Sequence, residues 1–247
     1  MSQPTPAAPP SEYRIAGQTV TMPVRIRTAT QHVAMFSVDA DAAQRMIDYS
    51  GLRVCRLRPH RAVVVLMLME YVDGDLGRYL EYGTNVMVNP PGSDASGLRA
   101  FQSAGAFIHH LPVDQSFTLE AGRTIWGYPK VLAEFVIRDG RRFSFGTTID
   151  GRFAVGMDFA PGIPVPSRFT SAPRVHSTYS HLDGVTRETA GHMTLSGVRY
   201  RPGGATVRLG NHPYARELAA LGFPKRALFS GSATNVEMTF ADAKEIP

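Results

Sequence analysis

Apolar residues in this chain recur mostly at the two-residue spacing of strands, and few segments show the spacing of long helices. Residues 52–58 alternate between apolar and polar side chains, which is typical of a strand with one buried face. Residues 62–69 are all apolar, which predicts a strand buried on both faces. Residues 13–27 are predicted to form one or two strands with a turn at residues 16–18. Further strands are predicted at residues 32–38, 79–88, 106–111, 131–137, 142–149, 152–159, 175–181, 192–200, 205–209 and 235–240.

Three short segments carry the end signals of helices. Asp39 is a favourable N-cap for a helix that reaches about residue 49 and is stopped by Gly51. Asp114 is expected to cap a second helix that runs through residue 121 and stops at Gly122, and residues 214–221 are expected to form a third. Helices are therefore predicted to be few and short.

Turn signals separate the predicted strands and leave no boundary between two domains. Asp139-Gly140 joins two apolar runs and predicts a hairpin, and Asp150-Gly151 repeats the signal. The proline-rich segment 160–173 predicts a surface loop. We expect residues 1–12 to be a disordered Pro-rich tail, and residues 13–247 to form one β-rich α+β domain.

Charge and cysteine content limit the possible partners and compartment. The net charge of the 247 residues is +5, but its densest cluster, at residues 53–61, is short and has no aromatic interleaving or nucleic-acid motif. We therefore expect no nucleic-acid partner, although the charge favours a small anionic substrate. No apolar run approaches the roughly 20 residues of a membrane helix, so no membrane partner is expected. The single cysteine, Cys55, predicts a packed thiol in a reducing, cytoplasmic protein.

Several common catalytic arrangements lack their sequence signals. The chain has no His-Glu-x-x-His motif, no Gly-x-Ser-x-Gly elbow and no phosphate-binding loop. His109 and His110 are adjacent, so on a regular strand they would point to opposite faces and not share a metal ion. We therefore expect no metal, while one of the two histidines either faces a pocket or is packed or solvated.

Lys130 is the strongest candidate for a reactive group. It follows Pro129 directly, and Trp126, Tyr128 and Val131 surround it with apolar side chains. Loss of hydration lowers the pKa of an ammonium group and exposes a free amine, which is the form that attacks a carbonyl carbon. A second Gly-aromatic-Pro-Lys sequence ends at Lys225, where Arg226 follows, and there we expect a solvated lysine.

Two motifs resemble the acetoacetate decarboxylase family. Gly122-Arg123, followed after four residues by Tyr128-Pro129-Lys130, is similar to the active-lysine motif of that family. Residues 79–83, Tyr-Leu-Glu-Tyr-Gly, are similar to its Tyr-x-Glu-x-Gly strand. The resemblance implies a mostly antiparallel, barrel-like sheet, a homo-oligomer and no cofactor. It also implies that Lys130 forms the Schiff base and that Glu81 handles protons or positions the substrate; acetoacetate decarboxylase is itself a standard example of an activated lysine.

Three positions depart from the family pattern. A second lysine usually follows the active one, and here that position is Val131. The pocket glutamate of an earlier strand aligns with Leu66, and an arginine near the pocket aligns near Thr30, although Arg25 or Arg27 can take its place. The substrate and the bond that is broken therefore stay open.

The sequence thus predicts a cofactor-independent carbon–carbon lyase for a small keto acid, with acetoacetate as the first candidate. Lys130 and Glu81 are the predicted catalytic residues, and the predicted substrate-binding residues are Tyr128, Trp126, His110 and Arg27. A pyruvate aldolase-dehydratase that uses the same lysine is the first alternative. A non-catalytic protein that binds a small ligand is the second.

Overall fold

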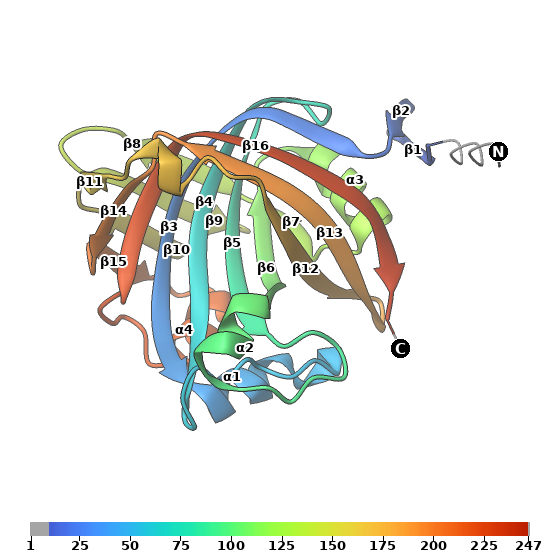
Figure 1. The fold of residues 1–247 in the computed structure, drawn as a ribbon. Coiled ribbons are helices and arrows are strands. Elements are labelled where there is room, and N and C mark those ends of the chain that lie inside the picture. The colour runs from blue at the N-terminus through green and yellow to red at the C-terminus, as the bar shows by residue number, and fades with distance from the viewer. Residues whose placement is uncertain (1–9, 247) are drawn as a thin grey trace.

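Seven long strands form a closed ring in the computed structural model, which describes residues 10–246 (Figure 1). The ring runs β16-β13-β12-β6-β5-β4-β3 and closes where β16 pairs with β3. All neighbours in it are antiparallel except β6 and β12. The ring strands are β3 (Val24–Asp39), β4 (Arg61–Gly74), β5 (Tyr79–Val88), β6 (Gly105–Val113), β12 (Arg174–Leu182), β13 (Val185–Ser196) and β16 (Phe229–Glu245).

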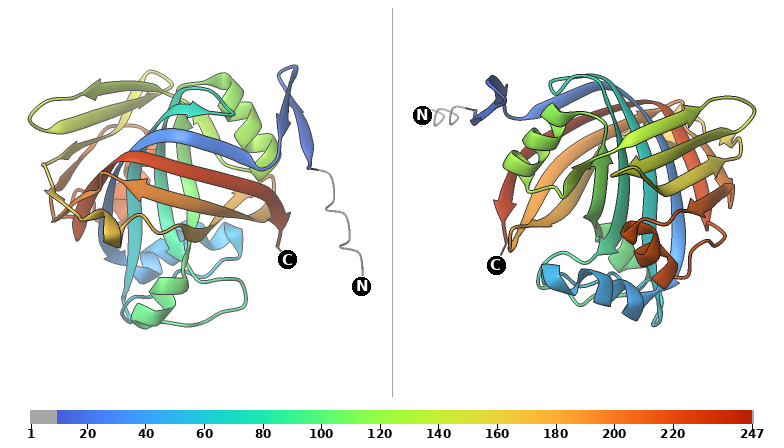
Figure 2. Two further views of the ribbon diagram at one scale, coloured as in Figure 1. Left: turned by 45° about the horizontal axis from the view of Figure 1, so that its top comes forward. Right: turned by 180° about the vertical axis from the view of Figure 1, so that it is seen from behind.

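A second sheet of four strands, in the order β15-β10-β9-β8, packs against the ring (Figure 2). Its strands are β8 (Glu134–Arg138), β9 (Phe143–Ile149), β10 (Arg152–Phe159) and β15 (Ala205–Leu209). The hairpin predicted around Asp139-Gly140 is confirmed, because β8 and β9 pair on either side of it. Asp150 and Gly151 both have positive φ, 49° and 70°, as a tight two-residue hairpin turn requires. The shorter strands are β1 (Glu12–Ile15), β2 (Gln18–Thr21), β7 (Lys130–Leu132), β11 (Ile163–Pro164) and β14 (Arg199–Pro202).

Helices cover one end and one side of the ring. Helices α1 and α2 lie together at one end, and α3 lies beside β7 (Figure 1). The predicted cap of the first helix is confirmed, because the Asp39 side chain accepts a hydrogen bond from the Ala42 N–H. Within residues 10–246, no helix is long and apolar enough to cross a membrane. The helices are α1 (Ala40–Ile47), α2 (Gly97–Ser103), α3 (Ser116–Trp126) and α4 (Pro213–Ala220), with 3-10 turns η1 (Asp48–Ser50) and η2 (Ser167–Phe169).

Several predicted elements differ from the structure. The second helix is capped by Gln115, whose side chain accepts a hydrogen bond from the Thr118 N–H, so the predicted cap at Asp114 is wrong. Residues 52–58 do not form a strand: they make only isolated bridges, including Val54 with Val88 at the end of β5, because no neighbouring strand continues alongside them. The helix expected to stop at Gly122 continues to Trp126 and ends at Gly127, whose φ of 62° is the left-handed conformation of a helix end. Residues 1–9 of the predicted tail lie outside the described residues, and β1 begins at Glu12.

The ring wall has an apolar core on each of its faces. One core packs the ring against the four-stranded sheet and helices α1 and α4, and it includes Leu66 and Leu68 of β4. The other core includes Met69 and Tyr71 of the same strand, together with apolar residues of α3. Because β4 alternates between the two cores, its continuous apolar run is explained, and the predicted strand with two buried faces is confirmed.

Candidate active site

A cavity of about 370 Å³ lies within the ring and receives side chains from all seven ring strands. Its lining is mainly apolar, and it includes six methionines: Met35, Met67, Met69, Met87, Met193 and Met238. Methionine side chains are flexible and polarizable, so such a wall can adapt to ligands of different shape. The cavity is in the size range of sites for small organic ligands.

Lys130 points into this cavity and is almost fully buried, with 2% of its surface exposed. The chain turns out of α3 at Gly127 and enters β7 at Lys130, which pairs with Leu111 of β6. The Lys130 Nζ lies 2.8 Å from Glu81 Oε2 and donates a hydrogen bond of 2.9 Å to Thr118 Oγ1. It also lies 5.0 Å from the centre of the Tyr79 ring.

Gly122 of α3 makes room for the lysine side chain. A Cβ atom at this position would lie 2.6 Å from both Cδ and Cε of Lys130, far inside normal contact distance. The glycine that the sequence marks as a helix stop therefore serves as a gap in the helix surface through which the lysine side chain passes. This contact links the two ends of the Gly122-to-Lys130 motif.

Glu81 is also buried and links the lysine to two stacked tyrosines. Its Oε1 accepts a hydrogen bond of 2.8 Å from the Tyr71 hydroxyl, and the Tyr71 ring stacks on Tyr79 at 4.1 Å. Burial, followed by the charge of Glu81, raises the pKa of Tyr71 and of Tyr79 well above 10, so both phenols stay protonated. Burying an ion pair costs several kcal/mol per ion before the charges attract each other, so this pair is poorly explained by stability alone and marks a candidate reactive site.

Tyr128 and Trp126, two predicted binding residues, also line the cavity. The Tyr128 hydroxyl lies 3.1 Å from Thr178 Oγ1, and the Trp126 indole N–H donates to the Ala241 carbonyl at 2.9 Å. Their rings stack with centroids 5.5 Å apart. Burial raises the pKa of Tyr128 to about 12, so its hydroxyl is also a constant hydrogen-bond donor.

Arg27, the third predicted binding residue, is not among the residues that line the cavity. It is half exposed and forms ion pairs with Asp73 and Asp75 at 2.8 and 2.7 Å, so its guanidinium is already occupied. The cavity instead receives Arg174 and His176 of β12. Residue types alone do not mark these two, because the pairing of β12 with β6 and β13 brings them to the cavity.

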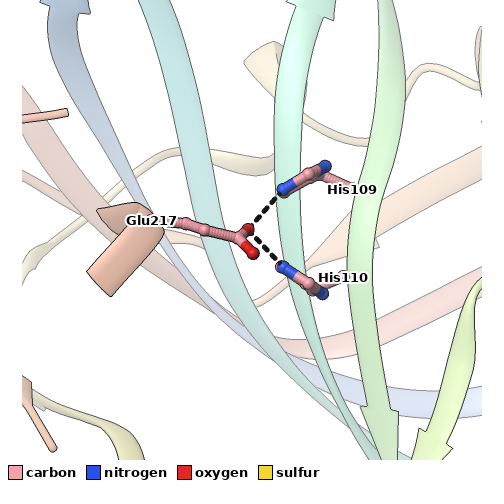
Figure 3. Close-up of side chains that lie close together, drawn as sticks. All are labelled: His109, His110 and Glu217. Atoms are coloured by element: carbon pink, nitrogen blue, oxygen red, sulfur yellow. Dashed lines mark hydrogen bonds and ion pairs between the residues drawn. The ribbon is translucent and has the colours of Figure 1, made fainter. Parts of the chain in front are cut away.

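His110, the fourth predicted binding residue, is also absent from the cavity lining. The expectation that His109 and His110 point to opposite faces is wrong, because β6 has a bulge there. Thr84 of β5 pairs with His110 and Asn85 pairs with Ile108, so His109 is an extra residue. Both imidazoles therefore point to the same carboxylate, Glu217 of α4 (Figure 3).

Two positions that depart from the family pattern, Leu66 and Val131, do not place their side chains in the cavity. Leu66 belongs to the other core, and the β4 residues that line the cavity, from Val65 to Tyr71, include no carboxylate. Val131 is 38% exposed while Lys130 is buried, so its side chain points away from the cavity. A valine at this position therefore removes no charge from the cavity of this protein.

The second lysine motif has a structural role. Lys225 Nζ donates to the Leu221 carbonyl at 2.8 Å and to the Ser37 carbonyl at 3.2 Å, so the prediction of a solvated lysine is wrong. It is half-buried at the end of α4 because that helix leaves carbonyls to be satisfied. The prediction of a packed thiol is confirmed: Cys55 is fully buried, and burial raises its pKa.

A closed, barrel-like ring of strands with a few short helices is the fold of acetoacetate decarboxylase-like proteins. The family model described as "Acetoacetate decarboxylase (ADC)" matches residues 2–243, so the chain belongs to the acetoacetate decarboxylase family. The predicted family and the predicted barrel-like fold are both confirmed.

Solved structures with this fold come from more than one kind of enzyme. Acetoacetate decarboxylase from Legionella pneumophila superposes with a TM-score of 0.68 at 18% identity, covering 100% of this chain and 92% of that one. The enduracididine biosynthesis enzyme MppR complexed with pyruvate gives a TM-score of 0.60 at 16% identity, covering 92% and 91%. At these identities the likeness establishes the fold alone. Among curated protein sequences, none matches this chain.

Proposed function

We propose that this protein is a cofactor-independent lyase that forms a Schiff base between Lys130 and the ketone of a keto acid. The observation that carries the proposal is the Lys130 amine, which faces an apolar cavity with Glu81 Oε2 only 2.8 Å away. Such a carboxylate can take the proton of the ammonium and leave an amine able to attack a carbonyl.

The residues support a complete reaction cycle for a 3-oxo acid. Glu81 accepts the Lys130 proton, the amine adds to the ketone, and Glu81 gives the same proton to the departing hydroxyl group, so that water leaves and an iminium ion remains. The bond to the carboxylate breaks, and its electron pair moves into the iminium. Carbon dioxide departs, and an enamine remains. Glu81, protonated again from solvent, gives a proton to the enamine carbon, and water then releases the ketone and returns Lys130 as an ammonium group. Tyr71 holds Glu81 in place through its 2.8 Å hydrogen bond.

The shape of the cavity favours a keto acid with an apolar chain. Glu81 and Met87 of β5 both line it, and they are six residues apart, which corresponds to about 20 Å of strand. Arg174 lies four residues before Thr178 in β12, which corresponds to about 13 Å along the strand in the direction away from Lys130. It is therefore too distant to hold a carboxylate next to the reacting ketone. The carboxylate that leaves would therefore be surrounded mainly by apolar side chains, which favours loss of its charge.

The length of the substrate's alkyl chain therefore gives a quantitative test of the proposal. Carbon dioxide release would be measured for acetoacetate, 3-oxohexanoate and 3-oxooctanoate. Each buried methylene contributes about 0.8 kcal/mol, so kcat/KM should rise about fourfold for each one added. Equal kcat/KM values across the series would contradict the idea that the cavity binds the alkyl chain of the substrate. If no 3-oxo acid released carbon dioxide, decarboxylation itself would be contradicted.

Aldol condensation and dehydration with pyruvate is the second candidate, because the same iminium can serve both reactions. The similar fold of MppR, which has been solved with pyruvate and with the condensation product of pyruvate and imidazole 4-carboxaldehyde, supports this candidate. Consumption of pyruvate that depends on an added aldehyde, without carbon dioxide release from 3-oxo acids, would favour this reaction. If the protein shows neither activity and forms no imine, the result would favour a non-catalytic ligand-binding protein.

A further inference from the structure

We infer that His109, His110 and Glu217 form a binding site for one divalent transition-metal ion such as Zn²⁺, separate from the lysine cavity. The His109 and His110 Nε2 atoms each lie 2.7 Å from the same Glu217 oxygen, Oε2 (Figure 3). One ligand atom from each residue lies within 4.8 Å of the other two. Two imidazoles and one carboxylate are a donor set that Zn²⁺ and related ions use in proteins.

The two distances from the histidine nitrogens to Glu217 need only a small adjustment to admit an ion. With Zn²⁺–ligand bonds of about 2.0–2.1 Å in a tetrahedral arrangement, neighbouring ligand atoms are about 3.3 Å apart. The two nitrogen–oxygen distances of 2.7 Å would therefore lengthen by about 0.6 Å. Glu217 can supply this movement, since its side chain is 41% exposed and lies on the short helix α4.

The orientation of His109 is already supported from its other nitrogen. The Tyr49 hydroxyl lies 2.9 Å from His109 Nδ1 and can accept the Nδ1–H when Nε2 binds an ion. A hydrogen bond to the second ring nitrogen is a regular feature of metal-binding histidines, because it fixes the tautomer and the ring orientation. The bulge in β6 completes the arrangement by placing both imidazoles on one side of the strand.

The site lies across the ring wall from Lys130. Ile108 and Leu111 of β6 line the lysine cavity, whereas the His110 ring packs at 4.4 Å on Tyr214, which belongs to the other core. An ion held here would tie α4 to β6. Because His109 is buried but Glu217 is half exposed, the ion would also keep one coordination position open to solvent.

Metal titration of the untagged full-length chain tests this inference. After treatment with chelator, Zn²⁺ should bind with a stoichiometry of one per chain, and Co²⁺ should give the visible absorption bands of a nitrogen–oxygen site. Mg²⁺ should not compete, because it prefers sites made of oxygen ligands. Zn²⁺ should also raise the unfolding temperature, since it binds the folded chain in preference to the unfolded one.

Two variants and a control assign the ion to these residues. Glu217→Gln keeps the shape but loses the charge, and it should weaken Zn²⁺ binding at least tenfold. Tyr49→Phe should weaken it by about 10–100-fold, the usual effect of removing a partner of a ligand. His60→Gln, on an exposed histidine, should leave binding unchanged. Absence of saturable binding, or equal affinity in all variants, would show that the three residues form only a hydrogen-bonded tie.

Discussion

Replacing Gly122 with alanine should disable Lys130 without unfolding the protein. The new Cβ would lie 2.6 Å from Cδ and Cε of Lys130, whereas carbon atoms in normal contact are about 3.5–4.0 Å apart. The lysine side chain must therefore move by about 1 Å. A displacement of about 1 Å at a reacting group lowers the rate by roughly 100-fold. The helix itself should tolerate the change, because alanine is favoured over glycine in a helix interior by about 1 kcal/mol.

The assay for this variant is the rate of reductive trapping. The protein would be mixed with excess keto acid and borohydride, and the modified fraction would be followed by intact mass. Gly140→Ala is the matched control, because its Cβ would meet no atom within 4 Å. We expect Gly122→Ala to be trapped roughly 100-fold more slowly than Gly140→Ala, while both melt cooperatively. A folded Gly122→Ala protein that is trapped at the normal rate would refute the idea that this glycine positions the lysine.

Two further predictions concern Glu81 and His32. Glu81→Gln should lower kcat by about 100-fold or more, the usual effect of removing a general acid–base group, while circular dichroism stays unchanged; an unaltered kcat would exclude its role in proton transfer. His32 stacks on Phe143 at 3.6 Å, and burial lowers its pKa to about 4. Because its pKa in the unfolded chain is about 6.5, protonation favours unfolding, and about 3 kcal/mol of stability should be lost as the pH falls from about 6.5 to 4. Urea unfolding of the wild type and His32→Phe at several pH values measures this loss, and identical pH dependence in both proteins would contradict it.

The parts of the fold that the sequence predicts well are those determined by local chemistry. The Asp39 cap and the Asp150-Gly151 turn depend only on nearby backbone groups, so their residue types were sufficient. Residues 52–58 show the limit of this reasoning, because an alternating pattern forms a strand only where a neighbouring strand is available. Gly122 shows another limit. A glycine near a helix end looks like a stop signal, but here a glycine is needed because the side chain of Lys130, eight residues later, occupies the space of a Cβ atom.

The candidate site was predictable to the extent that short motifs carry it. Lys130 and Glu81 stand out in the sequence, but their 2.8 Å contact depends on the pairing of both β5 and β7 with β6. Arg174 reaches the cavity through a parallel pairing between strands distant in sequence. The convergence of His109 and His110 depends on a bulge, which is a property of two paired strands and leaves no pattern in either one alone.

The most direct test of the proposed chemistry is the location of the amine that forms an imine. The chain has three lysines, at positions 130, 225 and 244, so peptide mass spectrometry after borohydride treatment with 3-oxooctanoate can distinguish them. Lys225 is an internal control, because it follows a similar Gly-aromatic-Pro sequence but donates its hydrogen bonds to backbone carbonyls. We predict a modification on Lys130 that is lost in Lys130→Ala. A modification on another lysine, or one that persists in Lys130→Ala, would contradict the proposed mechanism.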